Sequence, residues 1–550
     1  MADNDNKKIA DLLFPHIDKT VEYYLKKYPS RNLKEGVEVT RVAPSPTGYM
    51  HIGGVFQALI NSQISKHSGG IFYLRNEDTD SKREVLGAAD IFIPALNGFG
   101  IYPDEGFISQ TEEKGDYGPY IQSKRKEIYQ TFAKELVSRG CAYPCFCEKE
   151  DEEAKKEQAR LGVPTGYYGK WAKCRDLTYE QIKANIDAGK KFTIRIKANG
   201  DGKKRFIFED LRIGKTSLPV NMNDYVVLKS DGQAVYHMAH LVDDTLMHTT
   251  TVVRDESWFP SVPLHIQMFE YMGFKAPKYL HTPTVNTIDK ETGNSRKVSK
   301  RKDDWADSRF FHRVGYPKNA IVDYLMNLIN SNYEVWREAN PKAGVYEFPF
   351  SAENMSKSSA LFDMAKIDNI SKNVIAMMSG EELYVNLITW AKEYCPEIVS
   401  TLEKDKNYTI SVLGMDKNEA RPRKDITTYS EIKDFYSYMF ADWYKNEYPF
   451  AEKLKKEDIQ KAVLEYAKEY NHKDTKEEWF ARMKKVATSC NFATDNKLYK
   501  QNPEQYAGNM ADFAGIIRIV VTGRAQTPDL YSIMQILGEK EVLSRLNAKF

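Results

Sequence analysis

The stretch "VEVTRVAPSPTGYMHIGGVFQALINSQISKHS", residues 37–68, predicts the fold class of the first half of the chain. It begins with a β-prone run, continues through a Pro- and Gly-rich loop at residues 44–54, and then places apolar residues at helical spacing over residues 55–68. A second β-prone run at residues 70–75 and a second helical pattern at residues 84–100 follow. Because strands alternate with helices, we expect a parallel, doubly wound α/β sheet.

The remainder of the chain departs from this alternation. An amphipathic helical pattern at residues 122–140 leads to β-prone runs at residues 192–197 and 205–211, which we interpret as an inserted α+β segment. Strand and helix signals of the first kind return from residue 224 onward. Residues 360–550 are rich in helix formers, so we expect an all-α C-terminal half.

The composition is that of an ordinary globular protein. The chain has 550 residues, 42% of them hydrophobic, which predicts several domains. The formal net charge of +2 neither demands nor excludes a nucleic-acid partner, because the local distribution of charge decides such binding. Six cysteines are too few for a disulfide scaffold. Without a signal peptide or an apolar run of about 18 residues, we expect a cytoplasmic, soluble protein and, by default, a monomer.

The loop at residues 44–54 has the features of a phosphate site. It opens a helix, and a helix N-terminus presents free N–H groups and a partial positive charge to an anion. Gly53 and Gly54 leave room for a flat base near the backbone, and His51 can donate a hydrogen bond to phosphate. The tetrapeptide HIGG alone would fit a capped Gly-rich turn better. The full eleven-residue loop after the first strand favours nucleotide binding.

Two lysine-containing segments compete for the role of a second phosphate loop. In "RKVSKRK", residues 296–302, Lys297 and Lys300 flank a small serine, so that a flexible loop can close two ammonium groups over a triphosphate. A solvated basic loop is the alternative. In "MSKSS", residues 355–359, Asn354 stands where the first lysine is needed. We therefore give the phosphate role to the first segment and interpret the second as the join between the two halves of the chain.

Charged side chains also follow the predicted strands. Arg41 and Arg254 stand at the ends of two of them, where a guanidinium suits an anionic ligand, with a structural ion pair to a nearby acid as the alternative. The run "LRNEDTDSKRE", residues 74–84, places Glu77 after a buried strand, at the edge where a parallel sheet presents ligand-binding groups. Helix capping would explain the same acidic run.

Three cysteines give a weak zinc signal. Cys145, Cys147 and Cys174 supply three of the four ligands that a tetrahedral site needs, and Tyr168 or Asp176 could supply the fourth. The alternative is three ordinary thiols.

Six motifs in a fixed order resemble one enzyme family. "TRVAPSPTGYMHIGG", "RNEDTD", "VVLKSDG", "YHMAHLVDDTLM", "VVRDE" and "KVSKR" are similar to those of bacterial-type glutamyl-tRNA synthetases, class I enzymes with a Rossmann-type catalytic domain. The resemblance is dense over residues 37–330, and residues 420–435 resemble the family's anticodon-binding region. It implies ATP-dependent attachment of L-glutamate to tRNA(Glu) through a glutamyl-adenylate, with release of AMP and pyrophosphate.

The resemblance also implies roles for individual residues. The catalytic residues are His51, Lys297 and Lys300. The ATP-binding residues are Ser45, Thr47, Gly48, His51, Gly53, Gly54, Arg83, Glu256 and Lys300. The glutamate-binding residues are Arg41, Ala43, Ser45, Glu77, Tyr236, His240 and Arg254, with the arginines on the side-chain carboxylate. Arg423 reads the last anticodon base, and Cys145, Cys147 and Cys174 hold zinc.

This chain departs from the family pattern at two points. His240 stands where many members have Asn or a small residue, and the spacing from Cys147 to Cys174 is longer than in the family's zinc arrangement. The implied cofactors are ATP and Mg²⁺, with Zn²⁺ possible, and the implied partner is tRNA(Glu).

The expected domains are an N-terminal helical extension (1–36), the catalytic domain in two parts (37–121 and 223–303), an inserted acceptor-binding domain (122–222), a connector that contacts the tRNA stem (304–355) and an anticodon-binding domain (356–550). Three alternatives stay open: a small-substrate nucleotidylyltransferase, a catalytically weak RNA-binding paralogue, and a non-discriminating enzyme that also glutamylates tRNA(Gln). The long helical half argues against the first, and intact His51, Lys300 and Arg254 against the second.

Overall fold

A computed structural model describes residues 2–80, 85–147, 152–358, 360–417 and 422–549. The chain forms two compact units, one of Met1–Phe310 with Val322–Asp363 and one of Phe311–Ile321 with Met364–Phe550. The sequence placed the corresponding junction between residues 355 and 356.

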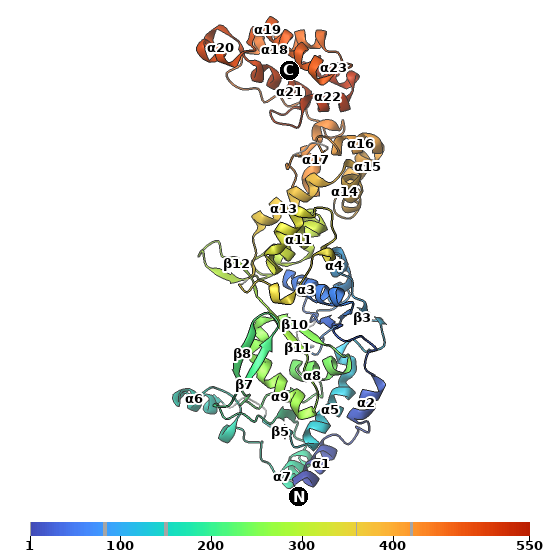
Figure 1. Ribbon diagram of the computed structural model, residues 1–550, viewed down its shortest axis with the longest axis vertical. Helices are drawn as coiled ribbons and strands as arrows, with labels where there is room; N and C mark the ends of the chain where they lie inside the picture. The colour runs from blue at the N-terminus through green and yellow to red at the C-terminus, as the bar shows by residue number, and fades with distance from the viewer. Residues whose placement is uncertain (1, 81–84, 148–151, 359, 418–421, 550) are drawn as a thin grey trace. The chain divides into compact units, whose positions relative to one another are not determined.

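The first unit is built on two four-stranded sheets (Figure 1). The first has the order β1 (Val39–Val42), β2 (Ile71–Leu74), β3 (Glu105–Ser109) and β4 (Glu112–Lys114). The second has the order β10 (Thr251–Asp255), β11 (Lys278–Thr282), β7 (Arg205–Asp210) and β8 (Gly214–Pro219). Strands β1, β2 and β3 are parallel, as are β10, β11 and β7.

The two sheets meet where β1 lies beside β10. The backbone N–H of Thr250 donates to the carbonyl of Val39 over 2.9 Å. Parallel strands therefore extend to both sides of this junction, in the order β3, β2, β1, β10, β11, which confirms the expected doubly wound sheet. In such sheets the point where the strand order reverses is the usual place for a ligand.

Helix α3 (Ile52–Ser68) connects β1 to β2 and is buried over most of its surface. It begins at Ile52, earlier than the predicted residue 55, because His51 already caps it. The helix expected over residues 84–100 is much shorter. Within the described residues 85–100, only α4 (Phe92–Gly98) is α-helical. Pro94 lies in its first turn, where the missing N–H breaks no hydrogen bond.

The N-terminal helices pack against the inserted segment. Helices α1 (Ala2–Leu13) and α2 (Val21–Lys27) share one apolar core with α5 (Lys126–Ser138), α8 (Tyr236–Leu246) and α9 (Val262–Met272). A three-stranded sheet of β5 (Ala142–Cys145), β6 (Thr193–Ile196) and β9 (Val226–Leu228) borders this core. The inserted segment also contains α6 (Glu152–Arg160) and α7 (Tyr179–Asp187). Its hairpin β7–β8 belongs instead to the sheet of β10 and β11.

The last strands of the first unit form a small fourth sheet. Its order is β13 (Ser295–Lys297), β12 (Val285–Ile288) and β14 (Ala360–Leu361). The hairpin β12–β13 ends at Lys297 and so leads directly into the basic loop. Helices α11 (Lys318–Ile329) and α12 (Asn332–Ala339) lie between the hairpin and β14 in the sequence.

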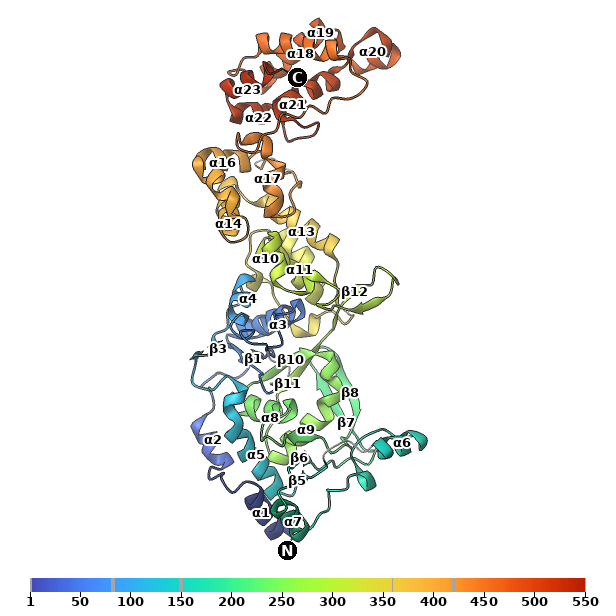
Figure 2. The same cartoon turned by 180° about the vertical axis from the view of Figure 1, so that it is seen from behind.

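The second unit is helical apart from one pair of two-residue strands, β15 (Phe492–Ala493) and β16 (Gly508–Asn509). Its helices are α13 (Met364–Met377), α14 (Gly380–Tyr394), α15 (Val399–Lys404), α16 (Lys406–Leu413), α17 (Ile432–Phe435), α18 (Lys456–Glu469), α19 (Lys476–Ser489), α20 (Asn496–Gln501), α21 (Met510–Thr522), α22 (Leu530–Leu537) and α23 (Glu539–Leu546). Figure 2 shows α14 and α16 side by side.

Residues 311–321, which the sequence placed in the connector, pack with the helical unit. They include most of α10 (Arg309–Val314). The indole N–H of Trp390 donates to the carbonyl of His312 over 2.9 Å, and the N–H of Tyr429 donates to the carbonyl of Gly315 over 2.8 Å. No described helix is both long and apolar enough to span a membrane.

Candidate active site

His51 caps α3 through its side chain. Its Nδ1 accepts a hydrogen bond from the N–H of Gly53 over 2.9 Å, so the neutral ring carries its hydrogen on Nε2. Burial and then the nearby ammonium groups of Lys300 and Lys297 lower the pKa of His51 to about 4. The ring is therefore neutral at pH 7 and offers one N–H beside the helix N-terminus.

The basic loop folds against the His51 loop. The Asp303 carboxylate accepts hydrogen bonds from the Ser299 N–H (2.9 Å) and from both terminal nitrogens of Arg296 (2.7 and 2.8 Å). The ion pair of Arg296 with Asp303 therefore stabilises the turn. Lys300 extends from the turn and donates to the carbonyl of Tyr49. Burial lowers the pKa of Lys300, while Lys297 is largely exposed, 3.9 Å from Asp255.

The two loops border a cleft of about 570 Å³. Five predicted residues line it: His51, Gly53, Gly54, Lys297 and Lys300. The sequence reasoning missed other lining residues, among them Gln57, Trp258, Thr282 and Pro283. The segment "DESWF" at residues 255–259 carries the only available signal for Trp258, an aromatic residue directly after a predicted strand. A cleft of this size between a helix N-terminus and two lysines suits a nucleoside triphosphate.

The other described residues predicted for ATP do not line this cleft. Ser45 and Thr47 are exposed in the loop after β1. Gly48 has a φ of 118°, a backbone conformation that side chains rarely adopt, which explains a glycine here. Glu256 is paired with Arg212 at 3.1 Å. Arg83 lies outside the described residues.

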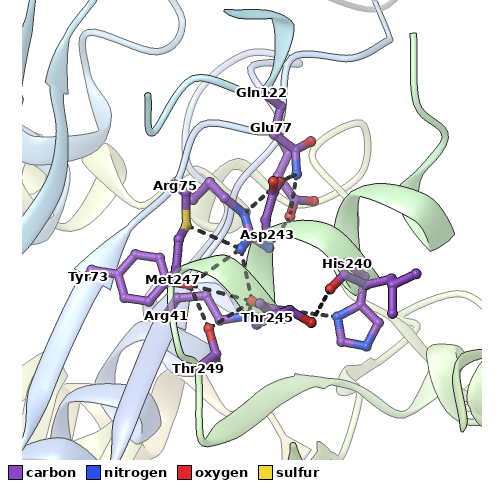
Figure 3. Close-up of polar contacts among 12 residues, drawn as sticks. Arg41, Tyr73, Arg75, Glu77, Gln122, His240, Asp243, Thr245, Met247 and Thr249 are labelled. Atoms are coloured by element: carbon purple, nitrogen blue, oxygen red, sulfur yellow. Dashed lines mark hydrogen bonds and ion pairs between the residues drawn. The ribbon is translucent and has the colours of Figure 1, made fainter. Parts of the chain in front are cut away.

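A buried network of charges lies beside the sheet junction (Figure 3). Asp244 is central to it. Its carboxylate pairs with Arg41 at 3.1 Å and with Arg75 at 2.9 Å, and it accepts from Nδ1 of His240 at 2.5 Å. Although burial opposes ionisation, these cations hold the pKa of Asp244 well below its usual range. For Arg41, the structural ion pair is therefore the contact present in the structure.

The network continues through a second carboxylate, Asp243. It accepts hydrogen bonds from Arg125 (2.6 Å), Gln122 (2.9 Å) and Tyr129 (2.8 Å). Glu77 joins on the same side, at 2.9 Å from the Arg75 guanidinium (Figure 3). Burial raises the pKa of Glu77. The predicted residues Arg41, Glu77 and His240 are thus connected through acids that the sequence reasoning did not select.

Arg254 differs from Arg41 in having no carboxylate partner among the described residues. It is 4% exposed, at the end of β10. Its Nε donates to Nε2 of His281 and its Nη1 to Nδ1 of His265, both over 3.0 Å, with the Tyr236 hydroxyl 3.4 Å from Nη1. Its Nη2 is buried and lacks a hydrogen-bond partner within the described chain. Within the described part of the chain, this guanidinium is thus a buried cation without an ion-pair partner.

Tyr236 connects the arginine to the cleft. Its ring lies 4.1 Å from the ring of Trp258, which lines the cleft, and it stacks on His240 at 6.0 Å. Ala43 is half-buried at the end of β1. His265 and His281 were not selected from the sequence. The signal was present, since five of the ten histidines fall within residues 237–281.

The described part of the MSKSS segment, residues 355–358, does not line the cleft. Met355 is buried, the Ser356 N–H donates to the carbonyl of Ile329 over 2.8 Å, and the Lys357 carbonyl accepts from Arg212 over 3.1 Å. The Lys357 side chain is exposed and is not among the lining residues. The segment joins parts of the first unit through its backbone.

The three cysteines lie together. The Sγ atoms of Cys145, Cys147 and Cys174 are all within 4.8 Å of one another, and those of Cys147 and Cys174 are 3.7 Å apart. The hydroxyl of Tyr167 lies 3.5 Å from the sulfurs of both Cys145 and Cys147. Tyr168, which the sequence suggested, donates instead to the carbonyl of Pro164. The residue that faces the cysteines is therefore Tyr167.

In the helical unit, Arg423 forms a two-point ion pair. Its Nε and Nη2 lie 2.6 and 3.2 Å from the carboxylate oxygens of Asp425. The side chain is half exposed, and Asp425 raises its pKa.

Comparison with family models defines the class. The model described as "tRNA synthetases class I (E and Q), catalytic domain" matches residues 38–369, which contain every strand of the first unit. The model described as "Anticodon binding domain" matches residues 387–549, within the helical unit. The chain thus combines the catalytic domain of a class I aminoacyl-tRNA synthetase with an anticodon-binding domain.

Individual relatives narrow this class. The glutamate–tRNA ligase of Clostridium perfringens (strain 13) is 45% identical over 545 residues, which cover 98% of this chain and 100% of the relative. That of Acetivibrio thermocellus is 43% identical and covers 98% and 99%. The chain belongs to the glutamate–tRNA ligase family. A crystal structure of a glutamate tRNA ligase from Elizabethkingia meningosepticum, in complex with its amino acid, matches with a TM-score of 0.70 at 25% identity, over 93% of this chain and 99% of that one.

Proposed function

We propose that the chain attaches L-glutamate to tRNA(Glu) in two steps with ATP as the energy source. In the first step an oxygen of the glutamate α-carboxylate attacks the α-phosphorus of ATP, and the bond to the bridging oxygen breaks, giving glutamyl-adenylate and pyrophosphate. In the second, a ribose hydroxyl of the terminal adenosine of the tRNA attacks the activated carbonyl and AMP leaves. The observation that carries this proposal is Arg254, a buried guanidinium without a carboxylate partner among the described residues, beside a cleft lined by phosphate-binding groups.

The first step needs no general base, because its nucleophile is already an anion. Catalysis then depends on positioning and on stabilising charge at the phosphates. His51 would donate from Nε2, and Lys297 and Lys300 would neutralise the phosphate oxygens as pyrophosphate departs. Ser45, Thr47, Gly48 and Glu256 would contact ATP from the flanking loops. Mg²⁺ bound to ATP would supply further neutralisation of the phosphates.

Glutamate would be recognised by its side-chain charge. A carboxylate near Nη2 of Arg254 would satisfy the one nitrogen that lacks a partner in the described structure. A neutral amide at the same place would leave the buried charge uncompensated, which is the basis for excluding glutamine. Arg41, Ala43, Ser45, Glu77, Tyr236 and His240 are proposed to line the remaining pocket.

The tRNA would contact several parts of the chain. Residues 122–222 are proposed to bind the acceptor end, residues 304–355 the stem, and residues 356–550 the anticodon, with Arg423 on its last base. The catalytic domain is proposed to consist of residues 37–121 and 223–303, preceded by the N-terminal extension at residues 1–36. These substrates imply a cytoplasmic location, and we propose a monomer.

Zinc is proposed at the cysteine cluster. Zn–S bonds of about 2.3 Å place two sulfurs of a tetrahedral site roughly 3.8 Å apart, close to the 3.7 Å between Cys147 and Cys174. Cys145, Cys147 and Cys174 would hold the ion, with the Tyr167 hydroxyl as the fourth ligand. The ion would act structurally, because all four groups are protein ligands.

ATP–pyrophosphate exchange with each amino acid, with and without tRNA, tests the function. We expect exchange with glutamate and with no other amino acid. Exchange driven by a different amino acid would overturn the proposal. Charging of purified tRNA(Glu) and tRNA(Gln) then distinguishes a discriminating enzyme from one that glutamylates both.

A further inference from the structure

We propose that Asp210, His281 and His265 are positioning residues that hold the Arg254 guanidinium through two imidazole relays, so that it selects glutamate over glutamine. This inference rests on the proposed function and deepens it. It concerns groups that do not touch the substrate but decide where Arg254 points and whether its charge is compensated.

The sheet register brings the first relay together. Arg254 on β10 is paired in register with His281 on β11, and Tyr279 on β11 with Asp210 on β7. The Asp210 carboxylate is buried and accepts four hydrogen bonds: from the N–H groups of Arg212 and Ile213 (3.0 Å each), and from the N–H (3.1 Å) and Nδ1 (2.7 Å) of His281.

These contacts determine the state of the His281 ring. An ionised carboxylate only accepts hydrogen bonds, so Nδ1 of His281 must carry the hydrogen. In the neutral ring Nε2 is then an acceptor, and it faces the Nε–H of Arg254 at 3.0 Å. Asp210 thus fixes the tautomer that can hold Arg254. The opposite tautomer would place two N–H donors against each other.

The second relay holds the other side of the guanidinium. Nδ1 of His265 accepts from Nη1 of Arg254 at 3.0 Å, which leaves the hydrogen on Nε2 of His265. That nitrogen faces Nδ1 of His237 at 2.9 Å and donates to it. In both relays the arginine donates to a ring nitrogen of a histidine, and the other ring nitrogen of that histidine donates onward.

The relays orient Arg254 without neutralising it. Burial lowers the pKa of His281, and it holds that of His265 well below the usual range, so both rings are neutral partners. Arg41 shows the contrast, because Asp244 accepts from its Nε and Nη2 and offsets its charge as well. With Nε and Nη1 occupied by neutral acceptors, Nη2 and the positive charge are left for a ligand carboxylate.

Substitution of His281 tests the first relay. His281→Leu removes the acceptor, whereas His281→Gln offers a carbonyl oxygen at a similar reach. For the Leu variant we expect the KM for glutamate to rise about 10- to 100-fold, the range for leaving one charged donor without its partner, while the KM for ATP changes little. The Gln variant should recover most of the loss. The ratio of kcat/KM for glutamate to that for glutamine should fall in the Leu variant and recover in the Gln variant.

The measurement is ATP–pyrophosphate exchange in the presence of tRNA, with thermal unfolding of each variant. His67→Leu, on the exposed side of α3, serves as the control and should leave all of these values unchanged. An unchanged KM for glutamate and an unchanged glutamate-to-glutamine ratio in His281→Leu would overturn the proposal, as would identical behaviour of the Leu and Gln variants. If the His281 variants do not fold, the pair His265→Leu and His265→Gln gives the same test from the second relay.

Failure of this inference is distinguishable from failure of the proposed function. If the wild-type protein activates an amino acid other than glutamate, the function is wrong. If the wild type is specific for glutamate and His281→Leu keeps that specificity, only the relay is wrong.

Discussion

The guanidinium of Arg41 and the carboxylate of Asp244 form an ion pair of 3.1 Å in which both side chains are at most 3% exposed. Arg75 shares the same carboxylate at 2.9 Å. Asp244 therefore compensates two buried cations at the junction of the two sheets. Its removal leaves charges that water cannot reach, which is among the most costly changes to a folded protein.

We expect Asp244→Asn to lower the free energy of unfolding by about 3–5 kcal/mol, the range for breaking a buried ion pair. Denaturant unfolding of the full chain measures this. Asp187→Asn removes an exposed partner of Lys183 and should lower the free energy of unfolding far less, because water screens exposed ion pairs. The pKa of Asp244 is lower in the folded protein, so its contribution is present above the unfolded pKa of about 4 and is lost as the pH falls further. Equal effects of the two substitutions would contradict this account.

His51 combines a structural and a catalytic role, and two variants separate them. Asn is a good N-cap residue and can accept from the Gly53 N–H, but it lacks the Nε2–H group. We expect both His51→Asn and His51→Ala to slow adenylate formation about 10²- to 10³-fold, with little effect on glutamate binding. Only the Ala variant should lose thermal stability as well. Single-turnover kinetics and thermal unfolding measure the two effects, and wild-type chemistry in His51→Asn would refute the catalytic role.

The same residue gives a pH prediction. Its folded pKa of about 4 lies below the ordinary value of about 6.5, so the ring stays neutral while the pH falls through 6.5. Adenylate formation should therefore show no inflection from His51 between about pH 5.5 and 7.5. An inflection near pH 6.5 that is present in the wild type and absent from His51→Asn would show that the ring titrates there.

Lys300 should matter far more than a neighbouring lysine of the same loop. Lys300 contacts the His51 loop, whereas Lys302 is exposed and lies 3.6 Å from Asp289. We expect Lys300→Ala to slow adenylate formation at least about 100-fold, because a charge that stabilises the departing phosphates is lost. Lys302→Ala should stay within about twofold of the wild type. Similar rates for the two variants would mean that the loop contributes only general positive charge.

The features predicted correctly from the sequence depend on residues close together in the chain. Strand β1, its loop and α3 are contiguous, and their alternation was sufficient to indicate a doubly wound sheet. The contrast between Arg41 and Arg254 was not predictable, because both are arginines at strand ends. The partners that distinguish them, Asp244 and His281, come from other elements. The sequence could not show which tyrosine faces the cysteines either, because Tyr167 and Tyr168 are adjacent and differ only in the direction of their side chains.

Tyr167 and Tyr168 provide a matched test of the zinc site. Tyr167→Phe removes the hydroxyl that faces Cys145 and Cys147, while Tyr168→Phe removes one that contacts a carbonyl elsewhere. We expect about one zinc per chain in the wild type, measured by elemental analysis. Tyr167→Phe should bind zinc more weakly than Tyr168→Phe by at least the roughly 10- to 100-fold in affinity that outer-shell partners provide. A chelator should therefore remove zinc faster from Tyr167→Phe. Protein without zinc, or equal retention in both variants, would argue for three ordinary thiols.

The proposed role of Arg423 in anticodon recognition can be tested separately from its ion pair with Asp425. Asp425 holds Nε and Nη2, so the guanidinium is fixed in orientation while half exposed to a ligand. If it reads the last anticodon base, Arg423→Gln should reduce the preference between tRNAs that differ only at that base by about 10- to 100-fold, as loss of one base contact typically does. Arg482 forms the same two-point pair with Asp474, so Arg482→Gln is the matched control and should leave the preference unchanged. Aminoacylation of the two tRNAs gives the preference as a ratio of kcat/KM values, and a wild-type ratio in Arg423→Gln would assign base reading to another residue of the helical unit.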